Sequence, residues 1–187
     1  MKILIVVTLL LIFSCNETVT QESNTENDID SLNSSSLRII MPDTLQVYNP
    51  YPEFKLASDS SIRKTFGPKL YTCVNVSCPS CIADIEKWND WIPEIYQKFK
   101  IPVVIICITK DNFEYIQYLF ESKEIRPFPF PIYFDIHNKF VSSNLIFLNR
   151  SSHYTVLTSK EGKVILRGNP FESQQTKTLF INALKSL

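Results

Sequence analysis

Two cysteines that stand three positions apart, Cys78 and Cys81, are the residues of this sequence best suited to chemistry. A strand pattern at 69–76 ends just before them, and a helical pattern starts at Cys81. A thiol at a helix N-terminus meets unpaired backbone N–H groups and the positive end of the helix dipole, and both favour the thiolate. Such settings lower thiol pKa values from about 8.5 into the range of about 3.5–7.5, and the thiolate is the form that attacks disulfides. The spacing therefore indicates a redox-active pair, with Pro79 suited to the first helical turn.

Two other interpretations of the pair stay open. A structural disulfide that never turns over is one, because exported proteins are oxidised by their compartment. A metal site is the other, although the chain has one Cys-x-x-Cys, and its histidines, His137 and His153, lack the close spacing of a zinc motif. We expect neither a metal nor a cofactor. The thiols of Cys73 and Cys107 fall in apolar strand patterns, where cysteine usually acts as a small buried hydrophobe.

The first 14 residues are typical of an export signal. Lys2 precedes an apolar run at 3–13, which is too short to span a bilayer because a spanning helix needs about 20 such residues. Ser14 and Cys15 then look like a bacterial lipobox, which makes Cys15 the expected lipidated first residue of the mature chain. An ordinary cleaved signal or an uncleaved anchor are the alternatives. We expect a location in the cell envelope, lipid-anchored to a membrane and facing the periplasm or the cell surface.

An acidic, polar segment at 15–37 follows this signal. It carries Asp and Glu among many Ser, Asn and Thr residues and has no Lys or Arg. Such a composition cannot bury enough apolar surface to offset its ordering entropy, so a flexible tether is expected. An acidic run just after a lipidated cysteine also resembles the surface-export signal of Bacteroidetes lipoproteins. The expected division is a signal peptide at 1–14, a tether at 15–37 and a folded domain at 38–187.

Length and charge narrow the function classes. The chain has 187 residues, 44% of them hydrophobic, with 19 basic and 19 acidic side chains. That length fits one globular domain with a core of ordinary size. A formal net charge of zero gives no argument for nucleic-acid binding, so no nucleic-acid partner is expected.

Apolar patterns in the domain alternate between strand and helix periods. Strands are expected, in chain order, at 45–48, 69–76, 101–109, 128–134, 154–158 and 164–167. The last two form a hairpin with Gly162 in its turn. Alternating units predict a parallel sheet in the first half, and the hairpin adds antiparallel strands. The fold class is therefore α/β, a sandwich with a mixed sheet.

Three helices are expected between and after these strands. The first, at 81–99, should be kinked or divided by Pro93, the second should be capped by Asp111, and the third should begin at Ser173. Residues spaced by three and four form the inward stripe of the first helix, namely Ile82, Ile85, Trp88, Ile92, Ile95 and Phe99.

The sequence around the cysteines resembles the thioredoxin-like fold, specifically the TlpA/ResA-like and AhpC/TSA-type lipoproteins of the Bacteroidetes type. The likeness rests on Cys-Pro-Ser-Cys between a strand and a helix, on Asp84 three residues after the second cysteine, and on the hairpin TVLTSKEGKVILRG at 155–168. It covers 45–187. The resemblance implies a thioredoxin-like three-layer sandwich, in which helices flank a central mixed sheet.

The same resemblance implies a role for each residue of the site. Cys78 is the expected exposed nucleophile, which forms a mixed disulfide, and Cys81 is the thiol that resolves it. Asp84 is expected to relay protons during resolution, with a solvated helix carboxylate as the alternative. His153 stands where the family has the cis-proline that faces the dithiol. Its imidazole can modulate the dithiol by hydrogen bonding or charge, because histidine titrates near neutral pH. A loop histidine of no consequence is the alternative.

The implied function is that of a membrane-anchored extracytoplasmic thiol–disulfide oxidoreductase. Its expected partners are cysteine-containing exported proteins or a membrane thiol–disulfide relay. Three positions depart from the family: Ser77 replaces a tryptophan, Thr72 a buried acid, and His153 the cis-proline. The missing tryptophan and the missing cis-proline favour a second hypothesis, a binding or assembly lipoprotein that keeps the fold with an inert or structural disulfide. A third is peroxide reduction, for which Arg150 is the candidate supporting arginine.

Overall fold

The computed structural model describes residues 37–51, 56–64, 67–148 and 153–187. The predicted signal peptide, the lipidation site at Cys15, nearly all of the tether and Arg150 lie outside these residues, and what we expect of them stays a prediction. Across the four described stretches, the structure contains no helix with the length and apolar character needed to cross a membrane.

A mixed sheet of six strands forms the centre of the domain, in the order β1-β4-β3-β2-β5-β6. The strands are β1 (Gln46–Tyr48), β2 (Leu70–Asn75), β3 (Val103–Ile108), β4 (Ile132–Phe134), β5 (His153–Thr158) and β6 (Val164–Gly168). β2, β3 and β4 run parallel, whereas β1, β5 and β6 pair antiparallel with their neighbours. All six predicted strands are confirmed. The fourth is shorter than expected and starts only at Ile132, because Pro129 and Pro131 have no backbone donor for a ladder.

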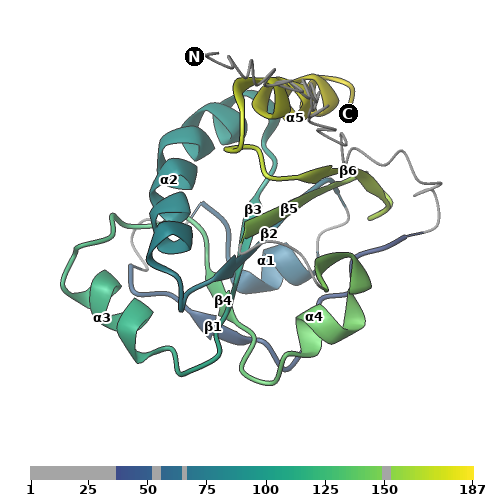
Figure 1. Ribbon diagram of the computed structural model, residues 1–187. Helices are drawn as coiled ribbons and strands as arrows, with labels where there is room; N and C mark the ends of the chain where they lie inside the picture. Colours follow the sequence, from purple (N-terminus) through teal and green to yellow (C-terminus); the bar gives the residue numbers. More distant parts are fainter. Residues whose placement is uncertain (1–36, 52–55, 65–66, 149–152) are drawn as a thin grey trace, which may run out of the picture.

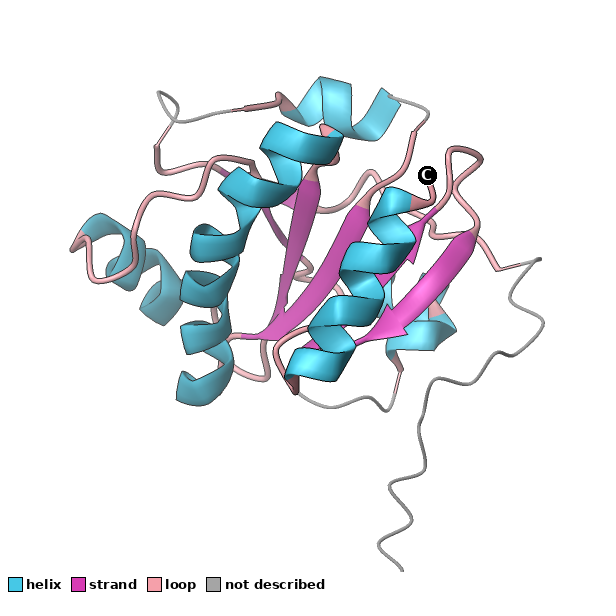
Figure 2. Ribbon diagram, turned by 90° about the horizontal axis from the view of Figure 1, so that it is seen from above, coloured by secondary structure: helices cyan, strands magenta, loops and turns pink. Residues whose placement is uncertain are grey.

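Helices cover both faces of this sheet and complete the expected three-layer sandwich. They are α1 (Asp59–Lys64), α2 (Pro79–Phe99), α3 (Glu114–Glu121), α4 (Lys139–Ser143) and α5 (Gln174–Lys185), with a 3-10 turn, η3 (Leu145–Phe147). Figure 1 shows α2 and α5 next to each other and α4 on the opposite lower side, and Figure 2 shows helices on both sides of the strands. Lys177 of α5 reaches α2, its Nζ lying 5.2 Å from the centre of the Trp91 ring.

Two expectations about the helices need correction. α2 continues through Pro93, so the proline does not divide the helix. Pro93 lies on the exposed side, where water can satisfy the carbonyl group that loses its donor, while buried side chains hold both halves of the helix in the core. α3 starts at Glu114 without an Asp111 cap, and Asn112 Oδ1 accepts the Glu114 N–H at 3.2 Å instead. The predicted start of the third helix at Ser173 is confirmed, since Ser173 precedes α5 as its N-cap residue and its hydroxyl accepts the Thr176 N–H at 3.0 Å.

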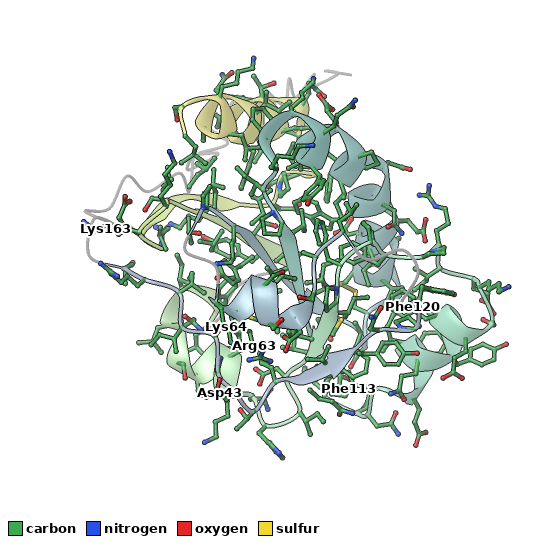
Figure 3. The ribbon with its side chains drawn as sticks, turned by 180° about the vertical axis from the view of Figure 1, so that it is seen from behind. Asp43, Arg63, Lys64, Phe113, Phe120 and Lys163 are labelled. Carbon is green, nitrogen blue, oxygen red and sulfur yellow. A yellow bond between two sulfur atoms is a disulfide. The ribbon has the colours of Figure 1, made fainter. Side chains whose placement is uncertain are left out.

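The segment before β1 is fastened to the end of the sheet that lies away from the carboxyl end of β2. Arg38 forms an isolated bridge with Lys163, in the turn between β5 and β6. Asn144 then bonds the Ile40 backbone twice, its Oδ1 accepting the N–H and its Nδ2 donating to the carbonyl, both at 2.7 Å. Figure 3 shows Lys163 across the molecule from Phe113, which follows β3. The chain therefore enters the domain far from the carboxyl ends of the parallel strands.

Candidate active site

The carboxyl ends of β2 and β3 meet at one end of the sheet, and the cysteine pair follows β2 there. β5 runs antiparallel to β2 and so starts at this end, where the Cα atom of His153 is the register partner of Val74. The structure thus brings together Cys78, Cys81 and the backbone of His153. No cis peptide bond occurs among residues 37–51, 56–64, 67–148 and 153–187.

Cys78 and Cys81 form a disulfide, with their Cα atoms 5.3 Å apart. Cys78 is the residue before α2 and is half-buried, whereas Cys81 lies one turn inside the helix and is only 2% exposed. The Cys78 carbonyl accepts the N–H groups of Cys81 at 3.0 Å and Ile82 at 3.1 Å, so the pair is built into the first turn. Cys78 is therefore the more accessible sulfur of the pair, which is the exposure expected of a nucleophile.

Two serines, Ser77 and Ser80, make contacts at the site that the Cys-x-x-Cys spacing does not predict. Ser80 Oγ lies 3.1 Å from Cys78 Sγ and 4.0 Å from Cys81 Sγ. Ser77 Oγ lies 2.6 Å from Thr109 Oγ1 and accepts the Lys110 N–H at 3.1 Å. Ser77 therefore ties the chain before the dithiol to the end of β3. The position of Ser80 between the two cysteines is the one sequence signal that could have pointed to it.

Asp84 is not the solvated carboxylate of the alternative interpretation. Its side chain is 11% exposed, and Lys87 Nζ donates to its Oδ1 at 2.5 Å. Asp84 follows Cys81 by three residues on α2, and side chains at this spacing are neighbours on a helix surface. The structure thus places a buried, ion-paired carboxylate on the side of α2 that carries the inner cysteine.

A neutral hydroxyl pair occupies the place of the buried acid of thioredoxins. Thr72 is fully buried, and Thr155 Oγ1 donates to Thr72 Oγ1 at 3.0 Å across the β2–β5 ladder. Another buried carboxylate, Asp135, caps α4, since its Oδ2 accepts the N–H groups of Phe140 at 2.9 Å and Val141 at 3.2 Å. Of these two buried carboxylates, Asp84 is the one on the helix that carries the inner cysteine.

Cys73 and Cys107 are the buried free thiols that the strand patterns predict. Burial raises the pKa of Cys73 to about 12, with a smaller contribution from the charge of Asp135. Burial also raises the pKa of Cys107 far above its ordinary value. Both remain protonated at neutral pH, so neither competes with the dithiol for a visiting disulfide. Across the described stretches, no three His, Cys, Asp or Glu side chains gather closely enough to hold a metal ion.

Comparisons with known proteins connect this arrangement to solved structures. No protein-family model and no curated protein matches the chain. The chain is similar to the crystal structure of a candidate thiol:disulfide interchange protein DsbE from Chlorobium tepidum, at 17% identity and a TM-score of 0.51, over 75% of this chain and 99% of that one.

Two further solved structures are similar at lower TM-scores. One is the exposed lipoprotein thioredoxin of Streptococcus pneumoniae, with 16% identity, a TM-score of 0.45 and coverage of 67% of this chain and 89% of that one. The other is a candidate protein disulfide isomerase from Bacteroides thetaiotaomicron, with 15% identity, a TM-score of 0.48 and coverage of 64% and 74%. The strand order, the two helix layers and the likeness to the Chlorobium structure establish that this chain has the thioredoxin-like fold.

Proposed function

We propose that this chain is a membrane-anchored, extracytoplasmic thiol–disulfide oxidoreductase that works through Cys78 and Cys81. The disulfide itself carries the proposal, because a half-buried sulfur at the start of α2 is bonded to a buried one inside the helix. This asymmetry gives the two sulfurs different tasks. One meets the partner, and the other stays within reach to close the cycle. The fold alone does not assign the activity, so the proposal rests on the sulfur geometry.

The reaction starts from the disulfide form. A partner thiolate attacks Cys78 Sγ, a partner–Cys78 bond forms, and the bond to Cys81 breaks with its electron pair moving to Cys81 Sγ, which takes up a proton. A second partner thiolate then attacks the partner sulfur of the mixed disulfide and releases Cys78 as a thiolate. The partner leaves oxidised by two electrons and this chain is reduced. The reverse sequence reduces a partner disulfide.

Asp84 and His153 are proposed to assist these steps. Cys81 must lose its proton before it can attack the mixed disulfide, and Asp84 is the buried carboxylate on its side of α2. Lys87 Nζ contacts Asp84 Oδ1 at 2.5 Å and so fixes the position of this carboxylate on α2. The backbone of His153 lies at the end of the sheet where the dithiol lies, which supports the proposed role of this residue in modulating the dithiol.

The proposed partners are cysteine-containing exported proteins or a membrane thiol–disulfide relay. A lipid on Cys15 is proposed to hold the chain to a membrane of the cell envelope, facing the periplasm or the cell surface. The bridge of Arg38 to Lys163 lies at the turn between β5 and β6, which is at the end of the sheet away from Cys78.

A redox titration tests the activity. Structural disulfides of exported proteins typically have potentials below about −300 mV, whereas catalytic ones are more oxidising. We expect the Cys78–Cys81 couple to titrate reversibly as a two-electron pair above that value. Buffers of defined thiol–disulfide ratio, quenched by alkylation and read by mass spectrometry, measure it. A Cys78–Cys81 couple that stays oxidised below about −300 mV would be a structural disulfide, and this result would rule out the proposed enzyme.

The lipid anchor has a separate test. Cys15→Ser is expected to abolish incorporation of a labelled fatty acid and to move the chain from the membrane to the soluble fraction, because stable anchoring needs the added acyl chains. Cys107→Ser, which alters a buried thiol, is the matched control and should keep the label. If Cys15→Ser is labelled and retained as strongly as the wild type, the lipidation proposal is wrong.

One observation favours the second candidate function, a non-catalytic binding or assembly lipoprotein. The pair of Thr72 and Thr155 offers no titratable group where thioredoxins have a buried acid. If Asp84 does not replace that acid, Cys81 has no proton acceptor and a mixed disulfide on Cys78 resolves slowly. The redox titration separates the two functions, because only a structural disulfide stays oxidised in strongly reducing buffers.

A further inference from the structure

A cavity of about 270 Å³ lies at the end of the sheet opposite to the dithiol. Lys69 and Pro102 line it, and they come directly before β2 and β3. Cys78 follows the other end of β2, and a strand of six residues is about 20 Å long. The cavity is therefore a second site, outside the region that the proposed function uses.

The lining of this cavity combines apolar surface with cations. Ile62, Pro68 and Pro102 supply the apolar part. Lys69 and Lys100 are its charged residues, and none of the described residues that line the cavity is acidic. Sites for small molecules typically have this combination, in which apolar walls surround a few polar groups that fix the orientation of the ligand. The lining therefore suits a ligand with an apolar body and a negative charge.

Lys69 is a lysine in an unusual setting, because it is only 8% exposed. Its backbone is fixed to the end of β5, since its N–H donates to Thr158 Oγ1 at 3.1 Å and its carbonyl accepts the Thr158 N–H at 2.9 Å. Burial lowers the pKa of its ammonium group, because the charged form loses hydration. An anion in the cavity favours the charged form and offsets part of that loss.

Lys100 is exposed and ends α2 with a φ of 56°, in the left-handed region that favours glycine. Its Nζ lies 5.3 Å from the centre of the ring of Tyr96, which also lines the cavity. A glycine would suit this backbone better, so the benefit of a lysine at this position lies in its side chain. Because Lys100 is exposed, the cavity also opens to solvent and is accessible to a ligand.

We propose that this cavity binds a small monocarboxylate with a short apolar chain. Lys69 and Lys100 pair with the carboxylate, and the chain packs against Ile62 and Pro102. At about 30 Å³ for each water displaced, the cavity has room for a ligand of on the order of ten non-hydrogen atoms. An inorganic phosphate would satisfy the lysines but has no apolar body to cover the rest of the lining. Binding here needs no reaction at the dithiol, so the site is independent of the redox cycle.

Calorimetric titration of the full chain with hexanoate is the first test. We expect saturable binding of one hexanoate to each chain. Hexanol lacks the charge and inorganic phosphate lacks the apolar chain, so each should bind at least about tenfold more weakly. If hexanol binds as tightly as hexanoate, the lysines are not used. If phosphate does, the apolar lining is not used, and either result overturns the proposal.

Substitution of the two lysines is the second test. Lys69→Met keeps an apolar stem without the charge and should weaken hexanoate binding about tenfold, because the lost pair is buried. Lys100→Gly should weaken binding about threefold, since exposed charge pairs contribute less. The same variant should keep or raise the Tm of the free chain, because glycine adopts the left-handed backbone without strain. A loss of affinity in Lys100→Gly is then not a loss of folding.

Lys98→Gln is the matched control. Lys98 is an exposed cation in the last turn of α2, where it pairs with Glu94, and it is outside the cavity lining. This variant should keep the affinity of the wild type, although it loses the same charge from the same end of the helix.

Amide chemical shifts recorded with hexanoate locate the site. They should change at 67–70 and 100–102 and stay constant at Cys78 and Cys81. Absence of binding to the wild type, shifts confined to the dithiol, or an unchanged affinity in both lysine variants would each refute the site. A dithiol that cycles normally in the redox titration would leave the proposed function in place after any of these results.

Discussion

In a Cys78→Ser protein, the rate at which a model disulfide is reduced is expected to fall to the rate in buffer alone. Cys78 is the half-buried sulfur of the pair, and Cys81 is 2% exposed, so a visiting disulfide has no other sulfur to meet at the site. The serine hydroxyl does not ionise at neutral pH and cannot replace a thiolate. Turnover of a model protein disulfide, followed with a thiol reductant in excess, measures the loss. A Cys78→Ser protein that works at the wild-type rate would falsify the assignment of the nucleophile.

Cys81→Ser should fail at a different step. Cys78 can still attack, but no second thiol is present to release the partner, so a mixed disulfide between Cys78 and the partner accumulates. Mass spectrometry without reductant detects this adduct, which should be absent from Cys78→Ser. Cys73→Ser is the matched control, because Cys73 is a buried thiol with a pKa raised to about 12 by its burial, and its loss should leave the turnover number near that of the wild type. Adducts formed equally by all three variants would mean that the two sulfurs have no distinct roles.

The parts of the fold that sequence could predict are those set by local periodicity. The central strands β2 and β3 are continuous apolar runs because both of their faces are covered, and each was placed to within two residues of its bounds. The hairpin followed from its glycine turn, where Gly162 adopts a φ of 77°. The dithiol was evident from the spacing of Cys78 and Cys81 between a strand and a helix.

What sequence could not predict depends on partners distant in the chain. The ion pair and burial of Asp84 depend on how α2 packs, and a carboxylate beside a lysine on a helix usually stays in water. Asp111 has the right residue type for a cap, but the loop after β3 places Asn112 at the start of α3 instead. The contact of Ser80 with Cys78 Sγ requires the side-chain geometry of the first turn, which spacing alone does not contain.

Trp88 and Trp91 of α2 also show that burial depends on contacts with segments distant in the chain, which sequence periodicity does not predict. Helical periodicity placed Trp88 on the inward stripe of α2 and left Trp91 outside it, yet Trp88 is 0% exposed and Trp91 is 3% exposed. The reason is tertiary: Phe171, before α5, packs edge-on against both rings, at 4.9 Å from Trp88 and 5.9 Å from Trp91. A second layer of aromatic contacts thus widens the buried face of the helix that carries the dithiol.

Trp88→Ala is therefore expected to destabilise the domain strongly. Removal of a fully buried tryptophan leaves a cavity between Trp91 and Phe171 and lowers the free energy of unfolding by about 3–5 kcal/mol. That is a large part of the 5–15 kcal/mol that holds a typical domain together. For a domain of this size, it corresponds to a fall in Tm of about 6–20 °C. Urea and thermal unfolding followed by circular dichroism measure both quantities.

The same variant separates stability from chemistry within one helix. Trp88 lies seven residues, or about 10 Å, beyond Cys81 along α2, so the geometry of the first turn should survive while the domain remains folded. Below its lowered Tm, Trp88→Ala should keep the redox potential of the wild-type dithiol. Tyr118→Ala, which removes a ring 56% exposed on α3, is the control and should change the free energy of unfolding by less than about 0.5 kcal/mol. A potential that shifts together with stability in Trp88→Ala would instead mean that the aromatic layer sets the position of the cysteines, and that the dithiol and the core cannot be treated as independent parts of α2.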